Sequence, residues 1–561
     1  MYARFMRLRE PIIVLDCQTT GANPSKGHLL EIAWCSLSTA EVTSHLVCLP
    51  TGASLPGAIT RLTGIRPADL SWAAAPAAVW SSLRRSLGPT PTPTLIHFAR
   101  FERPFLEKLH HEHGDGPFPL DIICTHEIAR RLLPDLPRRS LRALAGYFGH
   151  LKPELKRAAS HVAATLQIWD GLSALLAEQA PQVQTFDDLG RWLQEPAPRS
   201  SRRRYPMSRD RRLRLADAPG VYHFRNRRGE LLYVGKATSL RRRVNSYFQK
   251  QRRIPERTLE LLTQVADVEV ATTESTLEAA LLEAETIRRL TPPYNKALNR
   301  QLPVWFATRD LRDARTSPDP AHRVGPVPSR ETLTAVASLA DWLAGAREGG
   351  SPAAVLAIPA GRAPDRAVFS EGIAQFVRLH GSCVLDLPGL LRLGNRLWRD
   401  DKRAATEDKN LGRRAGPARK DIAPDSNESS GGRVSWTPEA VAAALDAMVL
   451  RAAHLVRRAH WLQELCSCNL HWRSAGETPR VLVVREARVV DRFVDDGRRL
   501  ALPPTAALDR RLGWLDSTAH DRLRVLGTEL KRLAARESQL TLQLARVRLD
   551  RRGLARRLWW I

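Results

Sequence analysis

The chain has few of the features that mark secreted or membrane proteins. It contains seven irregularly spaced cysteines in 561 residues, so neither a disulfide framework nor an iron–sulfur cluster is expected. Cys466 and Cys468 have no second cysteine pair near them, which argues against a zinc site. No apolar run approaches the ~18 residues of a membrane helix, and the charged start does not resemble a signal peptide. These absences predict a soluble protein of a reducing compartment without a membrane anchor.

Acidic residues are scarce relative to basic ones. The chain has 86 Lys plus Arg and 59 Asp plus Glu, which gives a formal net charge of +27. An excess of this size favours a polyanionic partner such as nucleic acid. The alternative is that an arginine-rich coding bias raised the count. The length is sufficient for three or four domains.

The most informative stretch is residues 215–299. Two short β-prone runs, at 220–224 and 231–234, are joined by a polar turn, and Gly229 stands where that turn needs a residue tolerant of positive φ. Apolar residues at helical spacing follow between 239 and 248. A second helical run, at 256–265, precedes a strand at 268–271.

A third helix is expected to begin at Ser275 and to run to Leu290. Ser275 and Glu278 have the spacing of a capping box, and Pro292 and Pro293 end the helix. Five short motifs punctuate this order: Pro-Gly-Val-Tyr at 219–222, Leu-Tyr-Val-Gly-Lys-Ala at 232–237, the helical run 240–248, Leu-Leu-Glu at 281–283 and Pro-Tyr-Asn at 293–295. Together they resemble the GIY-YIG nuclease domain, and most closely its version in UvrC-type excision-repair nucleases and their shorter Cho-type relatives.

Glu283 is the candidate metal ligand. Ala279, Ala280 and Ile287 lie one helical turn away from it, so a carboxylate interrupts an apolar stripe and needs a partner. The alternative is a structural salt bridge. Glu285 has Arg288 and Arg289 within helical reach, which favours a solvated ion pair for that residue. The resemblance implies Mg²⁺ or Mn²⁺ as the cofactor at Glu283.

An arginine of the run 240–248 is the candidate phosphate ligand. Arg241 and Arg243 flank the apolar stripe and Arg242 points away, so periodicity leaves two candidates. The resemblance implies Arg243, ten residues after Tyr233. Arg241 is predicted to bind DNA. A guanidinium suits this role because its fork matches phosphate oxygens and remains charged.

The resemblance also implies a tyrosine that helps to activate water. Tyr222 and Tyr233 are both candidates, and the alternative is that they only pack in the hairpin. Lys236 is expected nearby, where its charge lowers a proton affinity. Asn295 is expected to shape the site. The catalytic set is therefore Tyr222, Tyr233, Lys236, Arg243 and Asn295, and the site is predicted to be intact.

Residues 11–176 resemble another nuclease family. A buried-strand pattern at 12–15 ends in Asp-Cys-Gln-Thr-Thr-Gly, and a strand at 95–98 leads into a helix. The order resembles the DEDD-type 3′–5′ exonucleases, relatives of bacterial polymerase proofreading subunits, which implies a ribonuclease-H-like α/β fold. Members of that family hold two metal ions with four carboxylates and use a histidine as general base.

The metal-binding positions of this domain have changed. Asp16 remains, but Gln18, Glu102 and His161 stand where the resemblance implies glutamate, aspartate and aspartate, and Lys156 stands in place of the base histidine. Two divalent cations are poorly held by such a set. We expect a degenerate exonuclease that serves as a platform for DNA. The alternatives are residual one-metal activity or another ligand, such as Glu107 or Asp170.

The rest of the chain carries weaker signals. A basic linker at 181–214 contains Arg202, Arg203 and Arg204, which either lie on phosphates or form a solvated tether. Helices are expected at 333–343, 371–380 and 438–464, a hairpin at 481–494 and a basic helix at 521–558. A polar stretch at about 400–432 has the composition of a disordered insert.

The predicted architecture is a multidomain α/β protein. An exonuclease-like domain (1–180) and the linker (181–214) precede a small α/β GIY-YIG domain (215–300) and a mostly helical C-terminal region (301–561). The favoured function is a metal-dependent DNA endonuclease of nucleotide-excision repair that makes one incision, working in the bacterial cytosol near the nucleoid, with damage-recognition proteins of a UvrABC-type pathway as partners. The alternatives are a 3′–5′ exonuclease resembling the epsilon subunit of DNA polymerase III and a non-enzymatic DNA-binding scaffold.

Overall fold

The chain forms two compact units in the computed structural model. The first unit comprises residues 1–279 and 290–296, and the second comprises residues 280–289 and 297–561. The structure describes residues 12–88, 91–151, 154–198, 203–249, 253–296, 303–317, 319–345, 351–381, 385–410, 436–473, 479–494, 515–536, 539–544 and 547–557. Within these residues, no helix is long and apolar enough to cross a membrane.

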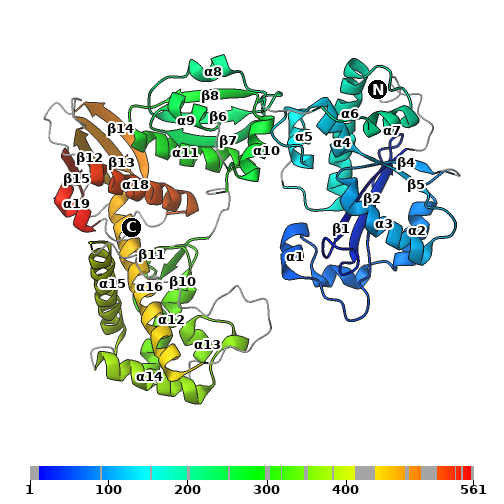
Figure 1. Cartoon of the computed structure of the whole chain (residues 1–561). Helices are drawn as coiled ribbons and strands as arrows, with labels where there is room; N and C mark the ends of the chain where they lie inside the picture. Colours follow the sequence, from blue (N-terminus) through cyan, green and yellow to red (C-terminus); the bar gives the residue numbers. More distant parts are fainter. Residues whose placement is uncertain are drawn as a thin grey trace. The chain divides into compact units, whose positions relative to one another are not determined.

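The first unit begins with a mixed five-stranded sheet in the order β3-β2-β1-β4-β5 (Figure 1). The strand β1 pairs antiparallel with β2 and parallel with β4. Alternate residues of β1 enter two different cores, with Val14 in one and Ile13 and Leu15 in the other. Both faces of the sheet are therefore covered, which explains the continuous apolar run of β1. The strands are β1 Ile13–Thr19, β2 Leu29–Ser36, β3 Thr43–Leu46, β4 Thr92–Ile96 and β5 Leu120–Cys124.

Helices pack on this sheet in the ribonuclease-H-like arrangement that the sequence predicts. The core on one face is completed by α4, α5, α6 and α7, and the core on the other face by α2 and α3. The helices of this part are α1 Gly57–Thr63, α2 Pro76–Arg84, α3 Ala99–His113, α4 Thr125–Leu132, α5 Leu141–Tyr147, α6 Ala158–Gln179 and α7 Phe186–Gln194.

A second, three-stranded antiparallel sheet has the order β7-β6-β8. Its strands are β6 Gly220–Arg225, β7 Leu231–Ala237 and β8 Asp267–Thr272, and its helices are α9 Leu240–Ser246, α10 Glu256–Gln264 and α11 Thr276–Leu290. The predicted hairpin is present, with Gly229 at φ +80°. The predicted cap of α11 is present as well, because Ser275 Oγ accepts the Glu278 amide at 3.2 Å. The carboxylate of Glu278 accepts from Glu274 N at 3.1 Å, one residue before the amide that a capping box uses.

The described part of the predicted basic linker is folded. Residues 203–214 contain α8 (Arg209–Leu213), and Met207 is buried in the core of the β6–β8 sheet. Arg211 pairs with Asp267, and the guanidinium of Arg212 lies 4.2 Å from the centre of the Phe248 ring. A fully solvated tether is therefore the wrong description of residues 203–214, because Met207, Arg211 and Arg212 have partners on the domain that follows.

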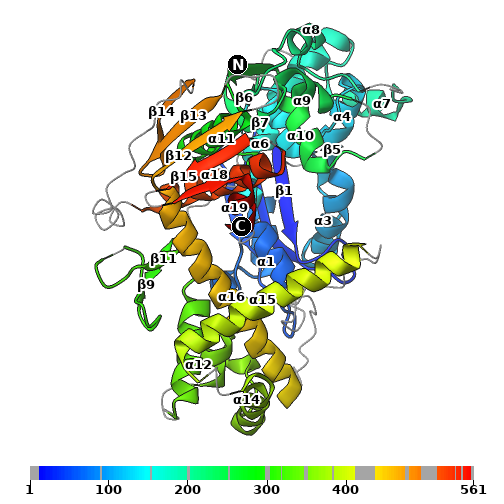
Figure 2. The same ribbon diagram turned by 90° about the vertical axis from the view of Figure 1, so that its left-hand side faces the viewer.

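The second unit is organised around the long helix α16 (Pro438–Leu465). Helices α12, α14 and α15 contribute to one hydrophobic core with it, and Figure 2 shows α15 and α16 crossing beside α12. The predicted helices at 333–343, 371–380 and 438–464 are confirmed. The first two are α12 Glu331–Leu343 and α14 Arg366–His380, and the third is α16. Two further helices, α13 Pro352–Leu356 and α15 Leu387–Asn410, were not predicted.

Two predictions for this region were wrong in part. The disordered insert was expected from residue 400, but α15 continues to Asn410, and 411–432 lie outside the described residues. The basic helix expected at 521–558 is instead α18 (Ser517–Arg536), β15 (Gln539–Gln543), β16 (Arg548–Asp550) and α19 (Arg551–Arg557). Leu540, Leu542 and Leu544 are buried at alternate positions, which is the period of a strand.

The C-terminal region therefore contains sheets that the sequence did not predict. The confirmed hairpin at 481–494 is part of a five-stranded antiparallel sheet in the order β14-β13-β12-β15-β16. Its remaining strands are β12 Cys468–Arg473, β13 Arg480–Arg485 and β14 Arg488–Val494. A smaller sheet has the order β10-β9-β11, with β9 Trp305–Ala307, β10 Ala314–Arg315 and β11 Val324–Val327.

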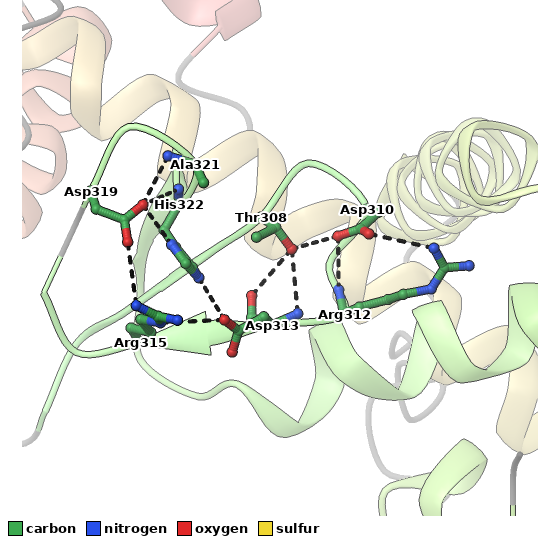
Figure 3. Close-up of polar contacts among 8 residues, drawn as sticks. All are labelled: Thr308, Asp310, Arg312, Asp313, Arg315, Asp319, Ala321 and His322. Atoms are coloured by element: carbon green, nitrogen blue, oxygen red, sulfur yellow. Dashed lines mark hydrogen bonds and ion pairs between the residues drawn. The ribbon is translucent and has the colours of Figure 1, made fainter.

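The loops of the smaller sheet are held by a buried histidine between two carboxylates (Figure 3). His322 Nε2 lies 2.9 Å from Asp313 Oδ2, and its Nδ1 lies 2.7 Å from Asp319 Oδ1. Arg315 contacts the same two carboxylates at 3.3 Å and 3.6 Å. On the other side of Asp313, the Thr308 hydroxyl donates to Asp310. This polar cluster joins the loops on either side of β10.

Candidate functional site

The β6–β7 hairpin places two tyrosines on one face of its sheet. Tyr222 lies opposite Gly235 in the register, and Phe224 lies opposite Tyr233. A Cβ atom at Gly235 would stand 2.3 Å from the Tyr222 hydroxyl oxygen. Glycine is therefore needed at 235 because the ring of Tyr222 fills the space that any other side chain would take.

The two tyrosines differ in environment. Tyr222 is fully buried, and its hydroxyl lies 2.8 Å from that of Tyr247. Burial, together with the neighbouring Tyr247 and Tyr233, raises the pKa of Tyr222 well above its ordinary value. Tyr233 is half-buried, with its ring centre 6.1 Å from that of Tyr222. The structure thus gives Tyr222 the surroundings of a packing residue and leaves Tyr233 partly open.

The arginine candidates separate as well. Arg241 pairs with Asp217 at 2.8 Å, and Arg242 lies 3.7 Å from the same carboxylate. Arg243 instead reaches the Tyr247 hydroxyl at 3.5 Å, from the preceding turn of α9. Burial lowers the pKa of Arg243, but Tyr222 and Tyr247 outweigh it, so the net pKa is raised and the guanidinium stays charged. Of the three arginines, Arg243 is the one beside the tyrosines.

Tyr247 is a site residue that the sequence reasoning missed. It was predicted only as part of an apolar stripe, yet it bridges Tyr222 and Arg243 through its hydroxyl. The signal was its position four residues after Arg243, which puts both side chains on one helix face.

The side chain of Asn295 is hydrogen-bonded to the strand that carries Tyr233. Its Nδ2 donates to the Val234 carbonyl at 2.8 Å, and its Oδ1 accepts the Val234 amide at 2.9 Å. The side chain is buried, and both bonds fix the backbone between Tyr233 and Gly235. Lys236 follows on the same strand, half-buried and opposite Val221 in the register.

Glu283 lies in the middle of α11. It is half-buried, and Ala279, Ala280 and Ile287 are buried around it, as the sequence pattern predicts. The division between the two units falls inside α11, so Glu283 belongs to the second unit and the tyrosines to the first. Glu285 is exposed. Its expected partner Arg288 instead pairs with Asp521 of α18, a correction that follows from the unpredicted packing of α18 on this helix.

In the exonuclease-like site, the side chains at the substituted positions bond to the remaining carboxylate. His161, on α6, lies 3.1 Å from Asp16 Oδ1, and Gln18 Nε2 donates to Asp16 Oδ2 at 3.2 Å. Burial lowers the pKa of His161, but the hydrogen bond and charge of Asp16 outweigh it and raise the net pKa. The two substituted residues therefore satisfy the carboxylate that a cation would otherwise bind.

The remaining residues of this site do not supply the missing charges. Burial and the nearby Asp16 raise the pKa of Glu102 well above its ordinary value, which disfavours a second carboxylate charge beside Asp16. Lys156 pairs with Glu154 at 3.7 Å on the surface. The alternative ligands Glu107 and Asp170 are exposed. The residues present do not fit a two-metal site.

No group of three or more His, Cys, Asp or Glu side chains able to hold a metal occurs in the described residues. This does not disfavour a magnesium site at Glu283, because Mg²⁺ commonly keeps several waters and uses one or two carboxylates. Of the basic residues predicted to bind DNA, Arg203 and Arg204 lie before α8, where the Arg204 amide donates to the Asp135 carbonyl, and Arg202 lies outside the described residues.

Comparison with known families defines the class. A UvrC-like GIY-YIG domain matches residues 218–296, and an exonuclease domain matches residues 13–164. The chain therefore combines two nuclease-type domains, as predicted from its motifs, and is a nuclease by its domain content.

The individual relatives cover different shares of the chain. UvrABC system protein C of Pelodictyon phaeoclathratiforme is 51% identical over 81 residues, which are 14% of this chain and 13% of that protein. A putative bifunctional exonuclease/endonuclease protein of Mycobacterium tuberculosis is 30% identical over 355 residues, 60% of this chain and 53% of that protein. The magnesium-bound GIY-YIG N-terminal endonuclease domain of UvrC from Thermotoga maritima is 33% identical and covers 16% of this chain and 93% of that one, with a TM-score of 0.14. The chain thus spans about half of the bifunctional relative and a smaller part of the UvrC relative.

Proposed function

We propose that the chain is a metal-dependent DNA endonuclease of excision repair that makes a single incision with its GIY-YIG site. The observation that carries the proposal is the Tyr222–Tyr247–Arg243 arrangement beside the half-buried Tyr233. It holds a permanently charged guanidinium, suited to phosphate oxygens, close to a second, half-buried tyrosine. Excess positive charge on the whole chain supports DNA as the substrate.

Each residue has a role in the proposed reaction. Glu283 holds Mg²⁺ or Mn²⁺, which when bound supplies charge stabilisation to the phosphate. Arg243 binds a nonbridging phosphate oxygen, and Tyr247 fixes the direction of that guanidinium. Tyr233 handles the proton of the attacking water, with the Lys236 charge stabilising the phenolate. Asn295 keeps the Tyr233 strand in place.

Tyr222 is assigned to packing in this scheme. A buried phenol with a raised pKa and a hydroxyl already bonded to Tyr247 is a poor proton acceptor near neutral pH. Its function is to support Tyr247, and through it Arg243.

The exonuclease-like domain is proposed to be inactive and to act as a platform. Asp16 is bonded to His161 and Gln18, and burial beside Asp16 raises the pKa of Glu102 well above its ordinary value. Both observations argue against a cation site for the second candidate function, a 3′–5′ exonuclease. Damage-recognition proteins of a UvrABC-type pathway are the proposed partners, in the bacterial cytosol near the nucleoid.

The test is cleavage of a terminally labelled, lesion-bearing duplex with Mg²⁺ or Mn²⁺. Glu283→Gln removes the charge that holds the cation, and we expect cleavage to fall by at least ~100-fold, the scale of losing one strong electrostatic contributor. Arg243→Ala is expected to cost a similar factor. The matched controls are Glu285→Gln and Arg242→Ala, which change exposed neighbours on the same two helices.

Binding and cleavage are separated by the same variants. Glu283→Gln should retain DNA affinity, and that affinity should fall steeply as salt rises, as expected for phosphate contacts. If Glu283→Gln cleaved DNA as fast as the parent, the active site would not include Glu283 and would lie elsewhere. Tight binding without cleavage by the parent would instead favour the scaffold.

A further inference from the structure

The exonuclease-like part of the first unit contacts the Pro-Tyr-Asn motif of the GIY-YIG part. The contact joins residues 138–149, around α5, to α10 and to residues 293–294. Helices α5 and α10 approach closely, because a Cβ at Gly146 would stand 1.7 Å from Gln264 Oε1. Gln264 is itself buried, so little room exists for a larger residue at 146.

Arg142 is at the centre of this contact. Its guanidinium lies 4.2 Å from the centre of the Tyr294 ring and 3.2 Å from Glu260 Oε1. Its Nη2 also donates to the Pro293 carbonyl at 3.4 Å. The side chain is 12% exposed. One arginine of the exonuclease-like domain thus holds both the ring and the backbone of the segment that precedes Asn295.

Glu260 binds the hydroxyl of Tyr294. Its carboxylate accepts the Tyr294 hydroxyl at 2.7 Å and the Ser140 hydroxyl at 3.3 Å, in addition to Arg142. Gln264 donates to the oxygen of the same Tyr294 hydroxyl. The ring is therefore fixed at its hydroxyl by two residues of α10, and at its face by Arg142 at 4.2 Å and, less closely, by Arg257 at 5.4 Å, which also donates to the Pro293 carbonyl at 3.0 Å.

Tyr294 and the residue after it are hydrogen-bonded to β7, the strand that carries Tyr233. The Tyr294 amide donates to the Leu232 carbonyl at 3.1 Å, and the next residue, Asn295, binds both polar groups of the Val234 backbone. These bonds bracket Tyr233 on both sides. A shift of Tyr294 would therefore be transmitted to the position of Tyr233 through one backbone–backbone hydrogen bond and two bonds from the Asn295 side chain to the Val234 backbone.

We propose that Arg142, from the exonuclease-like domain, is a positioning residue for the GIY-YIG reaction, and that the degenerate domain acts as an intramolecular support of that active site. The inference rests on the proposed function for its catalytic consequence. It assigns the exonuclease-like domain a task that requires neither metal nor catalysis. Misplacing a catalytic group by about 1 Å can cost as much as 10²-fold in rate, so a support of this kind has a measurable effect.

The experiment compares Arg142→Ala with Arg138→Ala in the full chain. Arg138 is the matched control, because it pairs with Glu256 across the same contact at 3.2 Å but the two side chains are 37% and 77% exposed. Arg142→Ala should lower kcat for nicking by about 10-fold or more, with KM for DNA unchanged. Amide hydrogen exchange at Val234 and Tyr294 should accelerate, and Arg138→Ala should change neither quantity.

Arg142→Lys guards against a trivial loss of folding. It retains the charge beside Glu260 but not the planar stacking on Tyr294, so kcat and exchange should both fall between those of the parent and of Arg142→Ala. Parental kcat and parental exchange in Arg142→Ala would overturn the proposal, as would acceleration spread evenly over the chain. If the parent does not cut DNA, the proposed function fails, and the exchange rates alone still decide whether Arg142 orders the Tyr233 strand.

Discussion

The hydroxyl groups of Tyr222 and Tyr247 lie 2.8 Å apart, and this pair supports Arg243. Of the two tyrosines named by the motif, Tyr222 is fully buried and its hydroxyl contacts Tyr247, whereas Tyr233 is half-buried. The distinction depends on burial and on a partner from α9, and neither can be read from the two tyrosine motifs alone.

Three tyrosine-to-phenylalanine substitutions test this division of roles. Tyr233→Phe should lower single-turnover nicking by ~100-fold or more, within the range that general acid–base catalysis contributes. Tyr222→Phe and Tyr247→Phe should each cost less, since they remove one and two supporting hydrogen bonds respectively, at about 1 kcal/mol each. Nicking rates across pH distinguish the roles. A loss that shrinks as pH rises is expected for Tyr233→Phe alone, and the same behaviour in Tyr222→Phe would contradict our assignment.

Gly235→Ala tests whether the space beside Tyr222 is essential. The added Cβ would stand 2.3 Å from the Tyr222 hydroxyl oxygen and 2.5 Å from its ring carbon, so the fully buried ring must move. Overpacking of this kind typically costs about 1–3 kcal/mol, and nicking should fall because Arg243 loses its support. Gly190→Ala is the control, since nothing lies within 4 Å of that Cβ. Thermal unfolding and nicking are measured for both, and parental behaviour of Gly235→Ala would show that Tyr222 is not fixed.

Local patterns predicted much of the first 300 residues. The cap at Ser275, the turn glycine Gly229 and the continuous run of β1 are short-range features, and the structure contains all three. The partner of Arg288 was not predictable. It lies 233 residues away on α18, and only packing decides between it and the nearby Glu285. The alternating leucines of β15 were hidden by flanking arginines that suggested one basic helix.

A metal-binding difference is expected when the exonuclease-like site is restored. In a Glu283→Gln background, adding Mg²⁺ or Mn²⁺ should leave thermal unfolding unchanged, because Asp16 is already bonded to His161 and Gln18. Gln18→Glu with His161→Asp places like charges beside Asp16. It should lower Tm by a few degrees without metal, at about 2–4 °C per kcal/mol, and divalent cations should reverse the loss.

Restoring exonuclease activity should require more than these two changes. Glu102→Asp and Lys156→His are also needed. Glu102 is one methylene longer than the aspartate expected there, and Lys156 pairs with Glu154 at the surface in the place of the expected base histidine. Shortening of a 3′-labelled single strand is measured. Exonuclease activity in the Glu283→Gln parent would show that Asp16 remains a metal ligand.

Replacing Asp521 should strongly lower the free energy of unfolding. Its carboxylate pairs with Arg288, whose Nη2 also donates to the Ser517 carbonyl at 2.9 Å, and the two side chains are 11% and 8% exposed. Asp521→Ala leaves a buried guanidinium without its counter-charge, which typically costs about 3–5 kcal/mol. Arg524→Ala is the control, since Arg524 is 49% exposed and lies 3.4 Å from the same carboxylate, so it should cost no more than about 1 kcal/mol. Denaturant unfolding measures both, and equal effects would contradict the burial argument.

The polar cluster of Figure 3 should give the second unit a local pH dependence. Hydrogen bonds to Asp319 and Asp313 raise the pKa of His322 above its ordinary value. The same bonds lower the pKa of Asp313, and they lower that of Asp319 to about 2. The stabilisation that comes from protonated His322 is fully present below the unfolded pKa of about 6.5 and is lost as pH rises through the higher folded pKa. The stabilisation that comes from the ionised Asp313 and Asp319 is present above the unfolded pKa of about 3.9 and is lost as pH falls through the lower folded pKa values.

Amide protection at Ala321 and His322 should therefore be greatest in the mildly acidic window between those limits. Protection should decline above neutrality, but not vanish, because Arg315 still contacts both carboxylates after His322 loses its proton. His322→Gln cannot carry the positive charge and should remove the decline while lowering protection throughout. His460→Gln, at a 77% exposed histidine 3.8 Å from Glu464, should leave the profile unchanged. Hydrogen exchange measured at several pH values, corrected for intrinsic rates, decides the matter, and a flat profile in the parent would show that His322 stays neutral between its two carboxylates.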